Sequence, residues 1–489
     1  MDFLDPKKSY RHKITLYIGY LLIAIAITIG TIILLYEAYG FGIGQNGQII
    51  QNGLIFLSSQ PNPANIYVNG KFKTQTNTSL KLVSGIYNFS IGLNGYRTWH
   101  RQIEIDGGTI VYFDYPLLIP NVLKTTEFKS YTSAPNLASE SLNRQYLLVM
   151  PPGSTNSFDL YNLNNPTQQP TSFSLPSSLV SPANSSNSWQ VISWANDNQH
   201  ILVSHTYDGK VEYLLINTAN PSSSVNLTQS FSSLSYTSLS FINETYDQYY
   251  LYNAADQSLA KVSLENPTSE TKVLSNVISF NSYLNNTILY ATSKNALPGK
   301  VNIDELTNGT NYHIKTFPAG STYLLNMASY NGVIYVAVGD QSANKVYIYK
   351  DPVNQIITDP KQVPVPSQVL FVKNPNYLNF STTAQYIMAE NGNQFGVYDI
   401  ENQHGYNYTT SLPLDAPQTH ATWMDGNRIA YISNNKLVIF DYDHNYQQTL
   451  VNASPLFPSF FDPNYQYVFT MKSNTDGSYQ LTRTSLLAP

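Results

Sequence analysis

The amino-acid sequence predicts an all-β protein in which an N-terminal transmembrane helix precedes a small β-sandwich and an eight-bladed β-propeller, with seven blades as the alternative. Three observations predict this fold. An uncharged stretch of 23 residues lies near the N-terminus. The chain holds 39 tyrosines and many Asn, Ser and Thr residues, which suit strands and the turns between them. A strand pattern recurs with a mean spacing of about 46 residues, close to the length of a propeller blade.

The uncharged stretch, residues 14–36, predicts a helix that spans a membrane. A helix of that length extends about 34 Å, enough for a hydrocarbon core of about 30 Å. A secretory signal peptide would have a shorter apolar region and a small-residue cleavage site, which this stretch lacks. Four basic residues precede it, namely Lys7, Lys8, Arg11 and Lys13. By the positive-inside rule, residues 1–13 form a cytoplasmic tail, and the bulk of this single-pass cell-membrane protein is extracytoplasmic.

The composition excludes several classes of protein and site. Charged residues make up 12% of the chain and the net charge is −5, so bulk electrostatics give no support to nucleic-acid binding. The chain has no cysteine, which excludes thiol nucleophiles, disulfides and thiolate zinc sites. What remains is a nearly neutral β-rich protein for which we expect no cofactor.

Residues 37–52 are rich in Gly, Gln and Asn and predict a linker, and residues 53–119 predict a small β domain. Short alternating segments in the second range are separated by turn signals, the strongest of which is Asn69-Gly70. Six or seven strands without a helix predict a small β-sandwich.

The same residues carry a recognisable pattern. It runs over Ser59-Gln60-Pro61, Ala64, Ile66-Tyr67-Val68-Asn69-Gly70, Leu80, Leu82, Gly85-Ile86-Tyr87 and Gly95-Tyr96. In this pattern residues 53–119 resemble the PEGA domain family. They depart from it at 74–78, where the usual Gly and Pro are missing. The resemblance implies a non-catalytic β module on an envelope or surface protein.

Residues 120–489 predict the propeller. The second strand of each repeat aligns at eight positions: Tyr146, Ile201, Tyr249, Ile288, Ile334, Tyr386, Ile429 and Tyr467. An aromatic residue often precedes this position by six to eight residues, as in Trp194 and Phe241, and we expect it to pack between blades. The last repeat has room for three strands, so residues 123–131 are expected to supply its fourth and close the ring. Seven blades would result if residues 235–275 and 277–318 formed a single blade.

No stretch of the sequence carries a catalytic motif. His200 and His205 are the closest histidine pair, but a spacing of five places them on opposite faces of a strand. Residues 441–445 begin like a calcium loop, yet Tyr446 and Asn452 stand where that loop needs Gly and Glu, which favours a turn. We therefore expect no catalytic, cofactor or metal site, and the sequence does not identify the binding residues.

These observations predict a non-enzymatic, membrane-anchored surface or envelope protein that presents its propeller as a binding or scaffolding platform. Its expected partners are an envelope or surface protein or a glycan, because tyrosine and asparagine make polar contacts at low entropic cost. The alternative is an envelope hydrolase or lyase that acts on polysaccharide or peptide in the central pocket of the propeller. Fold alone does not decide between them.

Overall fold

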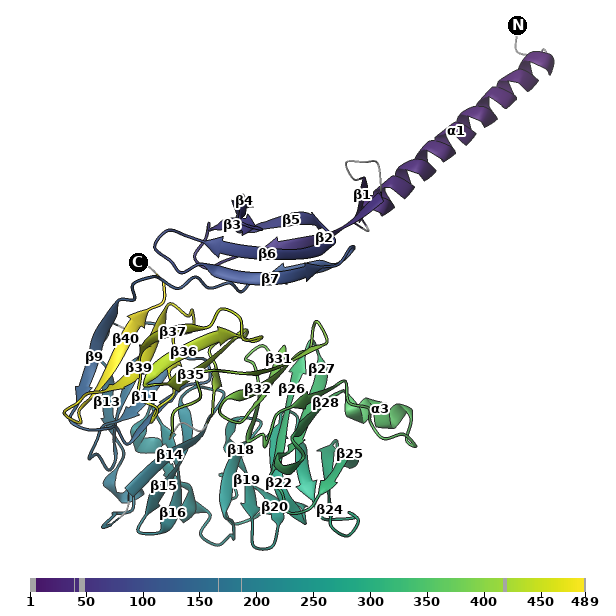
Figure 1. Cartoon of the computed structure of the whole chain (residues 1–489). Helices are drawn as coiled ribbons and strands as arrows, with labels where there is room; N and C mark the ends of the chain where they lie inside the picture. Colours follow the sequence, from purple (N-terminus) through teal and green to yellow (C-terminus); the bar gives the residue numbers. More distant parts are fainter. Residues whose placement is uncertain are drawn as a thin grey trace. The chain divides into compact units, whose positions relative to one another are not determined.

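The computed structural model describes residues 6–38, 40–43, 49–165, 167–185, 187–416 and 420–487. The chain divides into two compact units, residues 1–122 and 123–489. The first unit begins with helix α1 (Pro6–Ala38), a single long helix (Figure 1). This helix extends beyond the predicted span of residues 14–36 at both ends. Within it, His12–Glu37 is long and apolar enough to cross a membrane, and its best apolar window has no buried residue.

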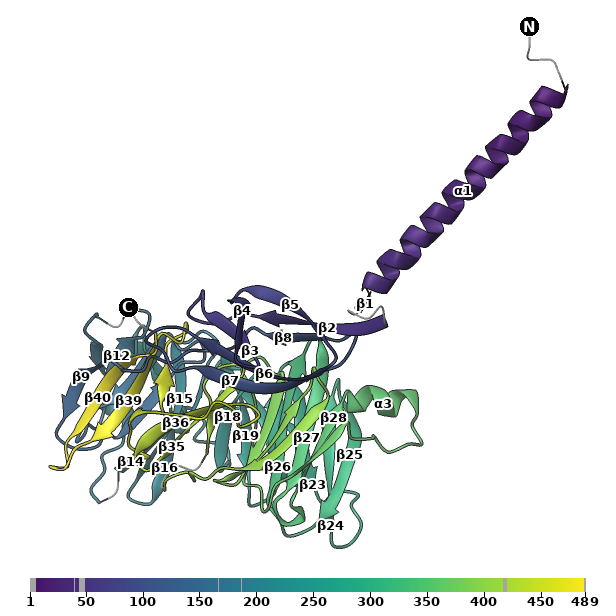
Figure 2. The same cartoon turned by 45° about the horizontal axis from the view of Figure 1, so that its top comes forward.

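Two four-stranded sheets make up the rest of the first unit (Figure 2). One has the order β1-β2-β5 with β8 parallel to β2, and the other has the order β4-β3-β6-β7. The strands are β1 (Phe41–Ile43), β2 (Ile49–Leu57), β3 (Asn65–Val68), β4 (Lys71–Gln75), β5 (Thr78–Val83), β6 (Gly85–Gly92), β7 (Trp99–Ile105) and β8 (Ile110–Phe113).

The stretch predicted as a linker, residues 37–52, is partly strand. β1 and the first residues of β2 lie within it and pair with each other, Gly42 opposite Ile50. The reason is that Ile49 and Ile50, two β-branched residues, extend β2 upstream of Gly53. The predicted Asn69-Gly70 turn joins β3 to β4 with both residues at positive φ, 49° and 75°, which is the geometry of a type I′ hairpin.

The described residues of the second unit form eight four-stranded sheets, which confirms eight blades. We number the blades in chain order. Their strands are, for blade 1, β10 (Leu137–Glu140), β11 (Tyr146–Met150), β12 (Ser157–Asn162) and β13 (Thr171–Ser174); for blade 2, β14 (Asn187–Trp194), β15 (His200–Tyr207), β16 (Lys210–Asn217) and β17 (Val225–Asn226); for blade 3, β18 (Ser238–Ile242), β19 (Thr245–Asn253), β20 (Ser258–Ser263) and β21 (Thr271–Leu274); for blade 4, β22 (Val277–Tyr283), β23 (Thr287–Thr292), β24 (Lys300–Thr307) and β25 (Thr310–Pro318). Residues 235–275 and 277–318 are therefore separate blades.

The remaining blades follow the same plan. Their strands are, for blade 5, β26 (Tyr323–Tyr330), β27 (Val333–Asp340), β28 (Lys345–Lys350) and β29 (Gln368–Phe371); for blade 6, β30 (Tyr377–Phe380), β31 (Tyr386–Glu390), β32 (Gln394–Asp399) and β33 (His404–Thr409); for blade 7, β34 (Thr422–Trp423), β35 (Arg428–Ser433), β36 (Lys436–Asp441) and β37 (Gln448–Asn452); for blade 8, β38 (Phe460–Phe461), β39 (Tyr467–Ser473), β40 (Tyr479–Ser485) and β9 (Thr125–Tyr131). Among the residues that the structure describes, short helices interrupt the connections: α2 (Leu227–Ser230), α3 (Pro352–Thr358) and 3-10 turns at Ser177–Leu179, Pro221–Ser223 and Gln341–Ala343.

Blade 8 closes the ring. Its outer strand β9 comes from the start of the unit and pairs antiparallel with β40, the last strand of the chain, from Tyr131 opposite Tyr479 to Thr125 opposite Thr484. This confirms the expected closure by residues 123–131. Because β9, from the start of the unit, pairs with β40, from its end, blade 8 has four strands like the other blades and leaves no extra edge exposed.

The core lies along the second strands, at the positions where the repeats align. β31 and β35 are buried along their whole length, since neighbouring blades cover both faces of the sheet. Trp194 shows how blades adhere: it belongs to a cluster that contains Leu148 of blade 1 and Ile201 of blade 2. Its indole Nε1 also donates to the Oγ of Ser139, 3.0 Å away in blade 1. The recurrent aromatic is thus an inter-blade contact here, as expected.

Turns account for much of the asparagine in the chain. Fourteen asparagines among the described residues adopt positive φ, where Asn is tolerated better than most side chains. Several turns that join the first and second strands of a blade also bond to the next blade. These bonds are Asn143 N to Asn198 Oδ1 (2.9 Å), Asn196 N to Glu244 O (2.8 Å) and Asn286 N to Asn243 Oδ1 (3.2 Å). They link blades 1 to 4 through one face of the ring.

Candidate functional site

The residues that sequence reasoning singled out do not form a common site. Lys7, Lys8, Arg11 and Lys13 all lie in α1; Lys13 is exposed, and the side chains of the other three lie outside the described ones. Residues 441–445 form the turn that follows β36, closed by a bond from His444 N to Asp441 O (2.7 Å).

His200 and His205 have separate carboxylate partners. The Nδ1 of His200 lies 2.5 Å from Asp197 Oδ2, whereas the Nδ1 of His205 lies 2.8 Å from Glu212 Oε1. In the part of the chain that the structure describes, no group of three or more His, Asp and Glu residues could hold a metal ion. The histidines therefore belong to local polar networks.

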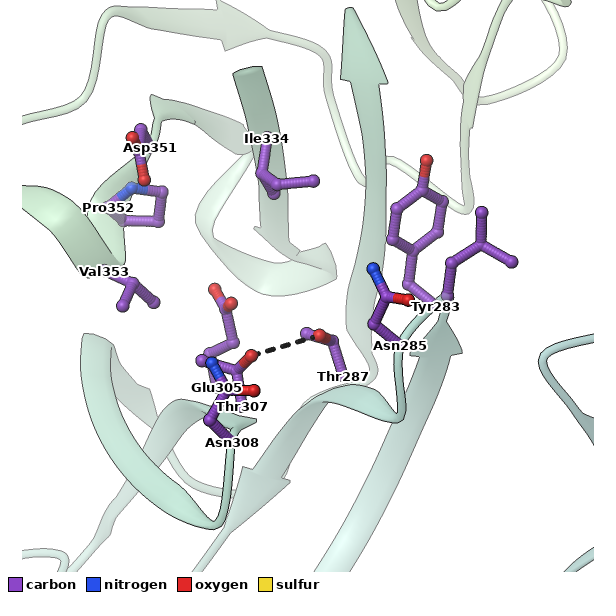
Figure 3. Close-up of a pocket in the computed structure, with 11 residues that line it drawn as sticks. Tyr283, Asn285, Thr287, Glu305, Thr307, Asn308, Ile334, Asp351, Pro352 and Val353 are labelled. Atoms are coloured by element: carbon purple, nitrogen blue, oxygen red, sulfur yellow. Dashed lines mark hydrogen bonds between the residues drawn. The ribbon is translucent and has the colours of Figure 1, made fainter. Parts of the chain in front are cut away.

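A cavity of about 400 Å³ lies where blades 4 and 5 meet. Figure 3 shows its walls, and residues from both blades line it: Tyr283, Leu284, Asn285, Thr287, Glu305, Thr307, Asn308, Ile334, Asp351, Pro352 and Val353. This lining contains two carboxylates and no basic side chain. We call the cavity the blade 4–5 pocket.

Two tight turns shape the blade 4 wall of the pocket. Asn285 and Asn286 both have positive φ between β22 and β23, and Asn308 and Gly309 do the same between β24 and β25. These turns place Thr287 at the start of β23 next to Thr307 at the end of β24, with their hydroxyls 3.2 Å apart (Figure 3). The threonine hydroxyls and the asparagine amides give this wall a hydrogen-bonding surface.

The blade 5 wall is set by the start of α3. Asp351 caps this helix in the left-handed region, at φ 45°, and its side chain accepts from Asn354 N. Its own N–H donates to the carbonyl oxygen of Ile334 (2.8 Å), which fixes Asp351 against β27. α3 contacts β25 of blade 4 and lies beside it in both views (Figures 1 and 2). The inserted helix thus carries a carboxylate and the apolar Pro352 and Val353 to the pocket.

Glu305 is the unusual residue of the pocket. It lies on β24, is 4% exposed, and its Oε2 has no hydrogen-bond partner among the described residues. Figure 3 shows its carboxyl group pointing into the space between Ile334 and the start of α3. Burial, and after it the charge of Asp351, raises the pKa of Glu305 to about 7. Burying a carboxyl group without a hydrogen-bond partner costs free energy, so the presence of Glu305 marks the pocket as a candidate site.

A second ionisable cluster lies between blades 1, 7 and 8, and it is engaged within the protein. Arg144, in the turn after β10, donates to the carbonyl oxygens of Trp423 (3.0 Å) and Met424 in blade 7. Glu140 accepts from Phe461 N of blade 8 (3.2 Å) and lies 3.8 Å from Arg144. The Arg144 bonds join the two blades on either side of blade 8, and the Glu140 bond joins blade 1 to blade 8, so these contacts stabilise the closed ring.

Sequence reasoning missed Glu305, although one signal was present. β24 alternates buried and partly buried positions, with Val301 and Ile303 on the buried face. Glu305 occupies the next position on that face, where the pattern calls for an apolar residue. A carboxyl at an inward position of a strand is a sign of a buried polar site. The neighbouring carboxylate, Asp351, lies in another blade and gave no signal in the sequence.

Comparison with known proteins extends the fold assignment of the first unit. Residues 52–119 match the PEGA domain family, which confirms the resemblance seen in the sequence. No curated protein matches the chain.

The propeller unit is similar to several solved structures at low identity. Hsv2 of Kluyveromyces lactis is 12% identical, with 73% of this chain and all of that one covered and a TM-score of 0.37. Oligogalacturonate lyase in complex with manganese is 10% identical, with 74% of this chain and 98% of that one covered and a TM-score of 0.38. Dihydro-heme d1 dehydrogenase NirN in complex with DHE is 10% identical, with 65% and 66% covered and a TM-score of 0.41. These values assign no ligand and no reaction to this chain.

Proposed function

We propose that the protein is a membrane-anchored, extracytoplasmic binding platform: α1 anchors it, the PEGA domain follows the anchor, and the propeller binds a polar envelope partner. The observation that carries the proposal is the exposed apolar surface of α1. Its side chains from Ile14 to Tyr36 include many large apolar residues that are 40% or more exposed, and such a surface calls for a lipid environment.

A binding role is supported by the chemistry of the two ionisable sites. The groups near the ring axis, Glu140 and Arg144, are occupied by cross-blade contacts. The blade 4–5 pocket offers carboxylates, amides and hydroxyls without a basic residue or an activated nucleophile in its lining. This set can hold a polar or cationic partner through hydrogen bonds and charge. Two carboxylates are also the catalytic groups of glycoside hydrolases, so an activity assay decides on the alternative of a hydrolase or lyase. Turnover of polysaccharide or peptide by the purified full chain would contradict the proposal.

The orientation of the anchor is tested by changing the charges that flank it. In a bacterial host, a C-terminal alkaline phosphatase fusion is expected to be active and a C-terminal green fluorescent protein fusion dark. Replacing Lys7, Lys8, Arg11 and Lys13 with Gln, together with Gln45→Lys, Gln48→Lys and Gln51→Lys, should lower the phosphatase activity severalfold, because positive flanks stay cytoplasmic.

The matched control changes distant charges instead, with Lys71→Gln and Lys73→Gln, and should leave both reporters unchanged. A phosphatase activity that does not respond to the flanking charges would contradict the predicted orientation. So would a fluorescent fusion in the unaltered chain.

A further inference from the structure

The lining of the blade 4–5 pocket carries two carboxylates and no basic side chain. Glu305 Oε2 is buried and unpartnered, and Asp351 places a second negative charge at the same cavity. The titratable groups in the lining are Glu305, Asp351 and Tyr283, so no positive charge of the lining offsets the two carboxylates. A buried carboxylate without a counter-charge is stabilised strongly by any cation that reaches it.

The size and walls of the pocket point to an organic cation. Its volume of about 400 Å³ lies in the range of small-molecule sites. Ile334, Pro352 and Val353 lie around the carboxyl group of Glu305 and give the pocket an apolar wall (Figure 3). A metal ion would leave that wall unused, and no group of three or more His, Asp and Glu ligands exists among the described residues.

A primary ammonium on an aliphatic stem satisfies both parts of the pocket. Its three N–H donors match carboxylate, hydroxyl and amide oxygens, and its methylene groups pack on apolar side chains. Glu305 and Asp351 supply the carboxylates, and Asn285 and Asn308 supply amide oxygens. An ion pair to a buried carboxylate such as Glu305 is stronger than the same pair on an open surface.

We propose that the blade 4–5 pocket binds an alkylammonium group of the kind that a lysine side chain carries, with Glu305 as its principal partner and Asp351 as the second. This inference rests on the proposed binding function and names the chemistry that the propeller recognises. It would place a lysine of an envelope partner in the pocket.

The test is calorimetric titration of the full chain in lipid nanodiscs with Nα-acetyl-lysine amide. We expect binding that weakens by roughly tenfold or more in Glu305→Gln, since a charge-assisted hydrogen bond to a buried carboxylate is worth about 1.5–3 kcal/mol. The affinity should rise between pH 6 and 8, with protons released on binding, because the ammonium stabilises the ionised carboxylate. Thermal unfolding shows whether the variant is folded.

Three controls separate the chemistry from its alternatives. Nα,Nε-diacetyl-lysine amide, which lacks the charge, should not bind, and Glu270→Gln, an exposed position, should bind as the unaltered chain does. Equal affinity in Glu305→Gln, no binding of the lysine amide, or binding of glucosamine or Ca²⁺ in its place would overturn the inference. None of these outcomes alters the reporter fusions, so failure of the pocket is distinguishable from failure of the anchor.

Discussion

Glu212→Ala is expected to lower the free energy of unfolding by about 3–5 kcal/mol at pH 7, because it leaves several buried hydrogen-bond donors unpaired at a cost of about 1–3 kcal/mol each. Glu212 is 2% exposed and His205 is 1% exposed, and both lie in blade 2. Besides His205, the carboxylate accepts bonds from Ser181 N and Oγ (both 2.8 Å) and from Asn226 Nδ2 (2.9 Å). Removing it leaves four donors without their acceptor.

His205 lies between two oxygen atoms in this network. Asn187 Oδ1 accepts from Trp189 Nε1 (2.9 Å), which is a donor only, so this atom is an oxygen. The Nε2 of His205 lies 3.1 Å from the same oxygen, and its Nδ1 lies 2.8 Å from Glu212 Oε1. Glu212→Ala would therefore leave the buried imidazole without this carboxylate.

Urea unfolding followed by tryptophan fluorescence measures the effect, and Trp189, whose ring centroid lies 4.3 Å from that of His205, reports from the network itself.

Burial favours a higher pKa for Glu212, but its hydrogen bonds outweigh burial and lower the pKa below 4.5. The contribution of Glu212 is therefore present above about pH 4.5 and fades as the pH falls through the lowered pKa. A deficit under about 1 kcal/mol for Glu212→Ala would contradict the account, and exposed Glu270→Gln is the control.

Glu305→Gln is expected to flatten the pH dependence of stability. The pKa of Glu305 is raised from 4.5 to about 7. The folded chain therefore holds this proton more tightly than the unfolded one, and stability falls as the pH rises from about 4.5 through 7. The shift corresponds to about 3 kcal/mol between the protonated and ionised limits. Glutamine cannot ionise, so the variant should gain that amount relative to the unaltered chain between pH 4.5 and 8.

The comparison is made as a difference because Glu140 also has a raised pKa, about 7, and contributes the same slope to both proteins. Unfolding free energies of the unaltered chain and of Glu305→Gln are measured in parallel across the pH range. Parallel curves would show that Glu305 is not the buried, unpartnered carboxyl described above. An excess of Nα-acetyl-lysine amide should reduce the difference at pH 8, since the bound ammonium stabilises the ionised form.

The repeat pattern predicted most of the propeller because each blade buries its second strand in the same way. All eight aligned positions lie on the second strands of their blades, and the aromatic Trp194 packs between blades 1 and 2 as expected. Closure by residues 123–131 was predictable because the last repeat lacked a strand. The structure of residues 37–52 was harder to predict. β1 and β2 pair within this stretch, but its many Gly, Gln and Asn residues favoured a linker.

The blade 4–5 pocket could not be predicted because its chemistry depends on which blades become neighbours. Glu305 and Asp351 are distant in sequence, and their proximity follows from the packing of α3, a helix inserted into blade 5, against β25 of blade 4. Turn-to-turn bonds such as Asn143 N to Asn198 Oδ1 were hidden for the same reason. Strand periodicity reports burial within one blade, whereas these contacts arise between blades.

The central claim is that the propeller lies on the extracytoplasmic side of the membrane and the N-terminal tail on the cytoplasmic side. The chain has no cysteine, so one introduced thiol can be labelled without background. Ser269→Cys stands in an exposed turn of blade 3, and Ser9→Cys lies before the apolar span. A membrane-impermeant maleimide applied to intact spheroplasts is predicted to label Ser269→Cys at once and Ser9→Cys only after permeabilisation. Labelling of Ser9→Cys, with protection of Ser269→Cys, would contradict the account.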